Sequence, residues 1–436
     1  MRNLYLKRRV SVTALSIALL SACGTPSSAP SEGSAVADEA AETSDAPQAL
    51  SDAPVLKLAD SVVETFHDSD TMMCGAQKVH IDGPVRAFED QNHKIHVTVS
   101  DPNATGWQWT GSASAFTSNP KTAKLDCTPV MPGNSAVNDP AKFDQKTWIQ
   151  AIYFRSSTAY AYGHEDYFGT RTSAPGCHDG GTTDGLPYCW YAAVALWTSS
   201  TTAEHLSFGR SANAPNHVAI YPHVQYPGHA STPTRGWIGY GTPSNILRGR
   251  TSDGTLDGYH YMFVYASSAY ADQDKGVCLF RSTDPTDRTR WRAWNGSAFA
   301  LPLHNPYSNT NSPCTVVDPS SSNTNVRSVV WHKPSRHYIA IFRDASAVRY
   351  ATSPDLLAWS TPQTLLVSTS EQAVYPVIID LDGGDYGDDN FDRLYSNGNS
   401  FLFYRKSIEP GHTRITRRRI EVSNYPADVP GSTNPG

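Results

Sequence analysis

Residues 326–353 (VRSVVWHKPSRHYIAIFRDASAVRYATS) contain three short runs of β-branched and aromatic residues, at 326–332, 337–343 and 347–353. Polar stretches with Pro, Ser and Asp separate the runs, and these residues favour turns. Runs of this length and composition predict the three strands of an antiparallel meander. No convincing amphipathic helix pattern appears after residue 60.

Runs of the same kind recur along the chain in four further groups of three. Repeated short sheets are typical of a β-propeller. The sequence therefore predicts an all-β fold, a five-bladed β-propeller over residues 59–425 with a C-terminal tail at 426–436. Two β-sandwich domains are the alternative. The four groups are 84–90, 94–100 and 107–115; 147–155, 158–165 and 192–199; 243–248, 259–266 and 276–282; and 374–380, 400–406 and 413–422.

A related phrase follows the third run of several groups. A Ser- or Thr-rich turn, an acidic residue in two of the three cases, and then an aromatic residue occur in sequence. We expect the aromatic residue to pack between neighbouring sheets. The aromatic residues are Phe208 after Thr198–Ser200, Trp291 after Ser282–Asp284, and Trp359 after Ser353–Asp355.

Residues 353–360 (SPDLLAWS), 241–246 (GTPSNI), 375–376 (YP) and 390–392 (NFD) resemble segments of five-bladed propeller glycoside hydrolases of the family 43 and family 32 type. Residues 353–360 (SPDLLAWS) resemble their S-x-D-L-x-x-W-S phrase, and 241–246 (GTPSNI) with 259–261 (YHY) resembles their third inner strand. Tyr375-Pro376 and 390–392 (NFD) resemble their last blade. The resemblance implies a propeller that cleaves a glycosidic bond with paired carboxylates.

Asp82 matches the catalytic base of that family, because it opens the first group in His80-Ile81-Asp82-Gly83-Pro84. A turn residue before Gly-Pro is the alternative interpretation. The family's general acid is a Glu that opens the third blade, where this chain has Thr242. A threonine does not supply that proton at neutral pH. This departure favours a non-catalytic carbohydrate-binding protein as the second hypothesis.

The stretch 162–167 (YGHEDY) offers a substitute acid. It is not an HExxH zinc motif, because Phe168 stands where the second His is required. On a strand, His164 and Glu165 point to opposite faces, so one of them would face the channel. We expect Glu165 or His164 to act as the acid; a polysaccharide lyase using His164 and Tyr167 is a related hypothesis, and a solvated polar cluster is the alternative.

The remaining candidates concern the sugar and a cation. Arginines in several strands are suited to clamping a carboxylate sugar, and aromatic rings to stacking on sugar rings. An acidic loop at 380–392 has an oxygen-rich spacing that suits structural Ca²⁺, although a solvated loop is the favoured interpretation, and no other cofactor is expected. The predicted substrate-binding residues are Arg86, Tyr167, Trp190, Arg343, Tyr375 and Asp392, and the loop contains Asp380, Asp382, Asp385, Asp388, Asp389 and Asp392.

The N-terminus predicts export. Basic residues between Arg2 and Arg9 precede an apolar run at 10–20, which is too short to span a bilayer but matches a signal peptide. The run ends in Leu20-Ser21-Ala22-Cys23, which resembles a bacterial lipobox with Cys23 as the lipidated residue. Residues 1–23 would then be removed or modified, and the acidic Ser/Ala/Pro-rich stretch 24–58 would be a disordered tether. This predicts a lipid-anchored protein of the cell envelope, at the outer membrane or the cell surface.

Six cysteines remain after Cys23, and an exported compartment permits disulfides. No CxxC occurs, which disfavours zinc. We expect sequential pairing, with Cys74–Cys127, Cys177–Cys189 and Cys278–Cys314.

The overall charge also limits the partners. The net charge is −6 and only 17% of residues are charged, which disfavours nucleic acid. The expected partner is an oligosaccharide or polysaccharide, with membrane contact through the lipid anchor only and a monomeric state. The sequence thus predicts an exported, carbohydrate-active protein of the glycoside hydrolase type.

Overall fold

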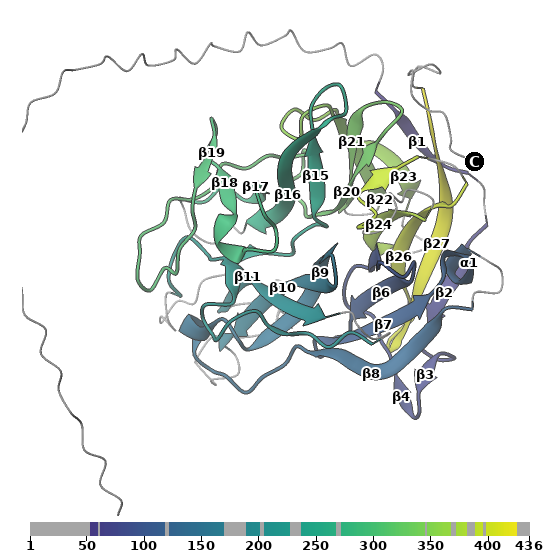
Figure 1. The fold of residues 1–436 in the computed structure, drawn as a ribbon, viewed down its shortest axis with the longest axis horizontal. Helices are drawn as coiled ribbons and strands as arrows, with labels where there is room; N and C mark the ends of the chain where they lie inside the picture. The colour runs from purple at the N-terminus through teal and green to yellow at the C-terminus, as the bar shows by residue number, and fades with distance from the viewer. Residues whose placement is uncertain are drawn as a thin grey trace, which may run out of the picture. The chain divides into compact units, whose positions relative to one another are not determined.

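The computed structural model is mostly β, as predicted (Figure 1). All described residues belong to one compact unit, 49–436. No helix in this described part is long and apolar enough to cross a membrane. The structure describes residues 53–59, 62–117, 122–169, 189–200, 205–226, 237–266, 272–344, 347–367, 372–381, 389–395 and 398–424.

The first meander has four antiparallel strands in the order β5-β6-β7-β8. Its first three strands lie where the sequence predicts them, while the short helix α1 (Ala113–Thr117) replaces the end of the third. A small hairpin, β3 (Met73–Cys74) and β4 (Gln77–Lys78), precedes the meander. The four strands are β5 (Arg86–Glu89), β6 (Ile95–Ser100), β7 (Thr105–Gly111) and β8 (Lys124–Pro132).

The second and third meanders share one sheet of eleven strands. The strand β14 (Trp237–Gly241) joins them, because it pairs in parallel with β11 and antiparallel with β16. The second meander has β9 (Lys146–Arg155), β10 (Thr158–Phe168) and β11 (Trp190–Ser200), with β12 (Gly209–Arg210) and β13 (Val218–Ile220) beside β11. The third has β15 (Leu247–Arg250), β16 (Leu256–Ala266), β17 (Gly276–Ser282), β18 (Arg292–Trp294) and β19 (Phe299–Leu301). The 3-10 helices η2 (Pro140–Lys142) and η4 (Arg288–Arg290) lie in connections.

The fourth and fifth meanders complete the chain. The fourth runs β20-β21-β22-β23, and the short β25 pairs in parallel with β20. In the fifth, β27 is central and pairs with β26, β1 and β2. The strands are β20 (Val326–His332), β21 (His337–Asp344), β22 (Ala347–Ser353), β23 (Gln363–Val367), β24 (Val374–Asp380), β25 (Arg393–Leu394), β26 (Ser400–Glu409), β27 (His412–Ser423), β1 (Val55–Leu58) and β2 (Glu64–Asp68).

The folded body begins a few residues before the predicted boundary at residue 59, because β1 lies inside the stretch predicted as tether. β1 pairs with the end of β27, and Leu56 is buried at 3% exposure in the core of the fourth and fifth meanders. The Leu56 amide also donates to the Tyr350 hydroxyl at 3.1 Å. Residues 55–58 therefore belong to the folded sheet and not to a tether.

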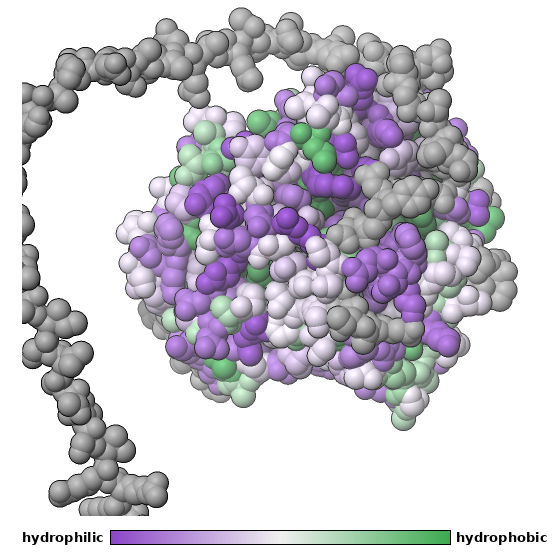
Figure 2. Space-filling view, in the orientation of Figure 1, coloured by the Kyte–Doolittle hydropathy of each residue, from purple (hydrophilic) through white to green (hydrophobic). Residues whose placement is uncertain are grey.

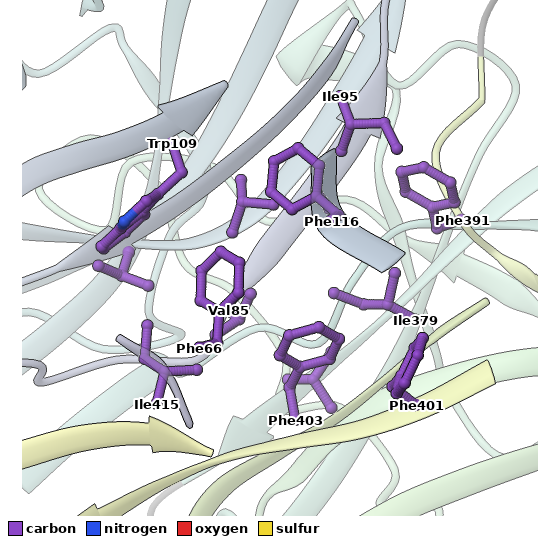
Figure 3. Close-up of a cluster of buried hydrophobic side chains, with 14 of the residues drawn as sticks. Phe66, Val85, Ile95, Trp109, Phe116, Ile379, Phe391, Phe401, Phe403 and Ile415 are labelled. Carbon is purple, nitrogen blue, oxygen red and sulfur yellow. The ribbon is translucent and has the colours of Figure 1, made fainter. Parts of the chain in front are cut away.

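A large core lies between the first and last meanders (Figure 3). Phe66 from β2 is in ring contact with Trp109, Phe116 and Phe403. Burial of rings like these is the main source of fold stability, at about 25 cal/mol for each Å² of apolar surface removed from water. Strand β2, from the N-terminal part of the chain, thus packs against both the first and the fifth meander.

The aromatic residues that follow the third strands do pack between neighbouring meanders, as predicted. The indole of Trp291 lies 5.7 Å from the Tyr162 ring and donates from Nε1 to its hydroxyl at 3.0 Å. Trp359 lies 5.8 Å from Phe263, edge to face. In each case the aromatic residue contacts the preceding meander. The repeated phrase is therefore a structural signal.

Residues 389–395 run across the C-terminal ends of the first strands. Asp389 bridges to Glu89 at the end of β5, and the Asn390 side chain pairs with both backbone groups of Phe154 in β9. The remaining contacts are Arg248 of β15 with Asp392, β20 with β25, and the Tyr395 amide with Asp380 of β24. One short segment thus contacts the first strand of every meander.

Two of the three predicted disulfides are confirmed. Cys74 pairs with Cys127, and Cys278 pairs with Cys314, with Cα separations of 5.1 and 6.1 Å. Cys177 lies outside the described residues, so its pairing with Cys189 stays a prediction. The first bond joins the β3–β4 hairpin to β8, which closes a loop of 53 residues.

The all-β prediction is confirmed. No sheet in the described part closes on itself, and β14 merges two meanders into one sheet. Strand pairing alone therefore does not define five separate blades.

Candidate functional site

Asp82 lies just before β5, and its backbone amide donates to the Ser100 carbonyl at the end of β6. This bond fixes the residue between two strand ends. The side chain is 33% exposed, and its Oδ1 accepts a 2.9 Å hydrogen bond from the Tyr375 hydroxyl. The Arg405 Nη1 lies 3.6 Å from the same oxygen. The carboxylate is thus accessible but held in one orientation.

Tyr375 is held in position by its backbone and by two cations. It is the second residue of β24 and has a φ of 54°, a left-handed value that is costly for a bulky residue and often marks a functional site. Arg327 and Arg405 lie 5.0 and 5.9 Å from its ring centre. Burial, with Asp82 nearby, raises the pKa of Tyr375 to about 12. The phenol therefore stays protonated and donates a hydrogen bond to Asp82.

Arg86 lies deeper in the same group. It is 3% exposed and donates to the backbone carbonyls of Gln150 in β9 and Arg327 in β20, the latter at 2.7 Å. Burial lowers the pKa of Arg86 to about 9, so the side chain still carries charge at neutral pH. We call Asp82, Arg86, Gln150, Arg327, Tyr375 and Arg405 the central cluster.

The central cluster has an excess of positive charge. Three guanidinium groups accompany a single carboxylate, that of Asp82. Burial, opposed by Tyr375 and Asp82, lowers the pKa of Arg327 as well. A cluster with unbalanced positive charge favours an anionic ligand, since bidentate guanidinium–carboxylate pairs are among the stronger polar contacts.

His164 and Thr242 are brought together from the second and third meanders. The Thr242 amide donates to His164 Nδ1 at 3.0 Å, and His164 Nε2 lies 2.8 Å from Asp166 Oδ2. Since Nδ1 accepts, the ring carries its proton on Nε2 and donates it to Asp166. Thr242 has a φ of 47°, strained for a β-branched residue. Thr242, which stands where the resembled family has its acid, is thus hydrogen-bonded to His164.

Glu165 is 1% exposed and lies on the other face of β10. Its Oε1 accepts from the backbone amides of Gln145 (2.6 Å) and Lys146 (3.2 Å), and its Oε2 accepts from the Thr147 hydroxyl. Burial raises the pKa of Glu165 to about 8, which would retain a proton at neutral pH. Its described contacts all serve the start of β9, and none is with Asp82.

The other predicted substrate-binding residues are dispersed. Tyr167 is 3% exposed and lies against Tyr226, with ring centres 5.1 Å apart. Trp190 is partly exposed and lies 4.5 Å from Phe168, edge to face. Arg343 is partly buried at the end of β21. Their contacts with a sugar stay predictions.

Asp392 lies at the opposite ends of the first strands from Asp82. It is 2% exposed and accepts three hydrogen bonds from Arg248, at 2.8, 3.1 and 2.9 Å. Although burial raises its pKa, this guanidinium lowers the pKa of Asp392 to about 2. The described contacts make it a structural partner of Arg248, and a substrate contact stays a prediction.

Sequence reasoning missed Gln150 and Arg327 as members of the site. A signal existed, because Arg86 and Arg327 each follow a valine at the start of the first strand of their groups. An arginine at that place in an otherwise apolar strand has to find a partner inside the fold. The two residues are 241 positions apart, so the sequence alone does not indicate that they meet.

Two groups of acidic residues are candidates for binding a cation. Asp70, Glu409 and His412 present ligand atoms within 4.8 Å of one another. However, the Lys78 ammonium already lies 2.7 Å from Asp70, so part of the negative charge is neutralised. In the predicted calcium loop, residues 382–388 lie outside the described part. Asp380, Asp389 and Asp392 accept bonds from backbone amides or from Arg248.

The chain is similar to several solved structures. No family model matches it, and no curated protein matches it in sequence. A family 117 glycoside hydrolase from Zobellia galactanivorans is 10% identical, with 86% of this chain and 92% of that one covered and a TM-score of 0.46. The endo-arabinase from Bacteroides thetaiotaomicron is 10% identical, with 83% and 99% covered and a TM-score of 0.43.

A GH43_1 enzyme from Xanthomonas citri is also similar, at 12% identity, with 78% of this chain and 88% of that one covered and a TM-score of 0.39. These structural neighbours are glycoside hydrolases. At such identities and scores, the likeness does not assign an activity to this chain.

Proposed function

We propose that the five meanders are the blades of a five-bladed β-propeller. Two sets of contacts support this arrangement. Residues 389–395 contact the first strand of each meander, and the central cluster joins residues of β5, β9, β20, β24 and β26. First strands that surround a common axis make such contacts, whereas two separate sandwiches would divide them between two cores.

We propose further that the chain is a carbohydrate-active protein of the glycoside hydrolase type, with the central cluster as its sugar-binding site. The observation that carries this proposal is the exposed Asp82 carboxylate held by Tyr375 and Arg405. Asp82 is the base in this proposal, because its carboxylate is oriented and reachable. The guanidinium groups favour a sugar that bears a carboxylate or another anionic group.

The hydrolase proposal also requires a second catalytic group. Glycoside hydrolysis needs an acid opposite the base, with the carboxyl groups about 5–10 Å apart. Glu165 has the raised pKa that a proton donor requires, but reaching it would require the start of β9 to move. In the lyase alternative, His164 and Tyr167 would be the active groups; Tyr167 is buried among other tyrosines.

A non-catalytic carbohydrate-binding protein is the second candidate function. It is favoured by Thr242, which occupies the position of the family's acid, and by the 1% exposure of Glu165. The same central cluster would bind the sugar without turnover. The two candidates therefore share a ligand site and differ only in product formation.

A glycan-array screen of the full chain, followed by product analysis on each hit, tests this function. The hydrolase proposal expects cleavage of at least one bound glycan, lost in Asp82→Asn and in Glu165→Gln while binding is kept. Arg336→Gln, an exposed residue of the fourth meander, is the matched control. Binding without any product supports the second candidate, and the absence of glycan binding contradicts both.

We also propose export and lipid anchoring through Cys23, which would place the folded body at the cell envelope. The two disulfides, Cys74–Cys127 and Cys278–Cys314, support an oxidising compartment. Cys23→Ser should move the protein from the detergent phase to the aqueous phase, because lipid chains supply the membrane affinity. Unchanged partitioning of the variant contradicts lipidation.

A further inference from the structure

The outer strands of the third meander form a groove away from the central cluster. The groove has a volume of about 300 Å³, at the lower limit for small-molecule sites. Figure 2 shows hydrophilic side chains over much of one face of this unit. The lining residues are Tyr259, Arg281, Thr283, Arg290, Arg292 and Phe299.

Arg281 is held between two aromatic rings. Its guanidinium lies 4.0 Å from the centre of the Tyr259 ring and 4.5 Å from that of Phe299. Its only polar side-chain partner in the described part is the Tyr261 hydroxyl, which itself bonds to Asp257. A guanidinium fixed by stacking keeps its N–H groups in one orientation, which lowers the entropy cost of binding an anion.

Two like charges face each other across this part of the sheet. Arg281 of β17 lies directly opposite Arg292 of β18 in the antiparallel register. Such a pair is destabilising by itself. Arg292 donates only to the carbonyls of Thr289 and Trp291, and among described residues neither arginine has a salt bridge. Asp287 is 3.1 Å from Arg290, and Asp257 reaches Arg281 only through the Tyr261 hydroxyl. Among the described residues, Arg281 and Arg292 therefore have no direct carboxylate partner.

We propose that this groove is a second, peripheral site for an acidic saccharide, in which Arg281 and Arg292 bind the carboxylate of one sugar unit. Thr283 offers a hydroxyl to the sugar, and the rings of Tyr259 and Phe299 offer apolar surface to its C–H groups. The choice of a saccharide over another anion rests on the proposed carbohydrate-active function. A long polyanion is disfavoured because the whole chain carries a net charge of −6.

Calorimetric titration of the full chain with trigalacturonate tests the proposal, with the methyl-esterified trimer as an uncharged comparison. Arg281→Gln and Arg292→Gln should each weaken one binding event roughly tenfold, the loss expected for a charged hydrogen bond. Arg336→Gln, which removes the same charge elsewhere on the surface, should change the affinity for trigalacturonate less than about twofold. Equal affinity in wild type and both groove variants overturns the proposal.

The site and the proposed function can fail separately. If Arg405→Gln abolishes all trigalacturonate binding while Arg281→Gln changes nothing, the groove is refuted and the central cluster is supported. If the groove variants alone lose binding and no glycan is cleaved, the groove stands and the hydrolase proposal fails. Inorganic phosphate or anionic phosphatidylglycerol vesicles that bind the groove as tightly as the trimer would contradict a saccharide ligand.

A thermal measurement gives an independent readout. Because Arg292 opposes Arg281, Arg292→Gln should raise the melting temperature of the free protein by about 1 °C. Trigalacturonate should stabilise the wild type more than this variant, which keeps only weakened groove binding and any binding at the central cluster. A ligand-induced shift of the same size in both proteins contradicts the proposal.

Discussion

The two ends of the first strands use charge in opposite ways. At the N-terminal ends, Asp82 and Arg405 are 33% and 23% exposed and lie 3.6 Å apart. At the C-terminal ends, Asp392 and Arg248 are 3% and 22% exposed and make three hydrogen bonds. A partly exposed carboxylate with a partner at 3.6 Å can exchange that partner for a ligand, whereas a buried carboxylate with three hydrogen bonds holds segments of the fold together.

The largest expected difference between the two ends is in stability. Asp392→Ala removes the buried carboxylate that accepts three hydrogen bonds from Arg248, so we expect a loss of about 3–5 kcal/mol in the free energy of unfolding. Asp82→Ala, the same change at the exposed end, should cost less than about 1 kcal/mol. Urea unfolding of both variants measures the difference. Similar losses would mean that the two ends are not structurally distinct.

The pH dependence of stability should also come from the buried end. Burial, with Asp392 nearby, raises the pKa of Asp389 to about 7, above its unfolded value near 4. The folded state then binds more protons between these values, so stability is greatest below pH 4 for this group and falls as pH rises to 7. Asp389→Asn should remove this pH-dependent fall, which amounts to about 2–4 kcal/mol in the free energy of unfolding. An unchanged pH profile in urea unfolding contradicts this.

Arginines at different depths offer a smaller contrast. Arg86→Met removes three hydrogen bonds to backbone carbonyls from a residue that is 3% exposed, and we expect a loss of about 2 kcal/mol in the free energy of unfolding. Arg405→Met should cost less than about 1 kcal/mol, because its 3.6 Å pair with Asp82 is only partly buried. Thermal unfolding of both variants at pH 7 tests the order. A larger loss of stability in Arg405→Met than in Arg86→Met would contradict this account, in which Arg86 is the more deeply buried residue.

A small structural effect is also expected for Tyr375→Phe. It removes the 2.9 Å hydrogen bond to Asp82 while keeping the ring under Arg327, so stability should change by less than about 1 kcal/mol. Binding of a responsive glycan should nevertheless weaken severalfold, because Asp82 loses its orientation. A variant with unchanged binding would separate Tyr375 from the ligand site.

The strand groups could be predicted because each strand is short, apolar and bounded by turn residues. The strands β17, β20, β22 and β24 occupy the ranges that the sequence indicates. The outer strand β8 was missed, since its sequence KLDCTPVMP is polar and half of it is exposed. Edge strands bury one face at most, so they carry a weaker pattern.

The candidate site was predicted only in part. Asp82 and Tyr375 were both named from the sequence, and they are in contact. Glu165 could not be distinguished from a channel residue, because alternation along β10 tells which residues share a face but not what covers that face. The amides of Gln145 and Lys146 cover it here. The contacts of segment 389–395 are equally hidden, since Asn390 recognises the backbone of Phe154 across 236 positions.

The most direct test of the account is product formation by Asp82→Asn on a glycan that binds the wild type. The exposed carboxylate is proposed to act as the base, and the amide keeps its shape and its bond to Tyr375. We expect the variant to bind the glycan with little change and to lose turnover by at least about a hundredfold, the usual contribution of a general base. Full turnover in Asp82→Asn would contradict the assignment of this end of the molecule as the active site.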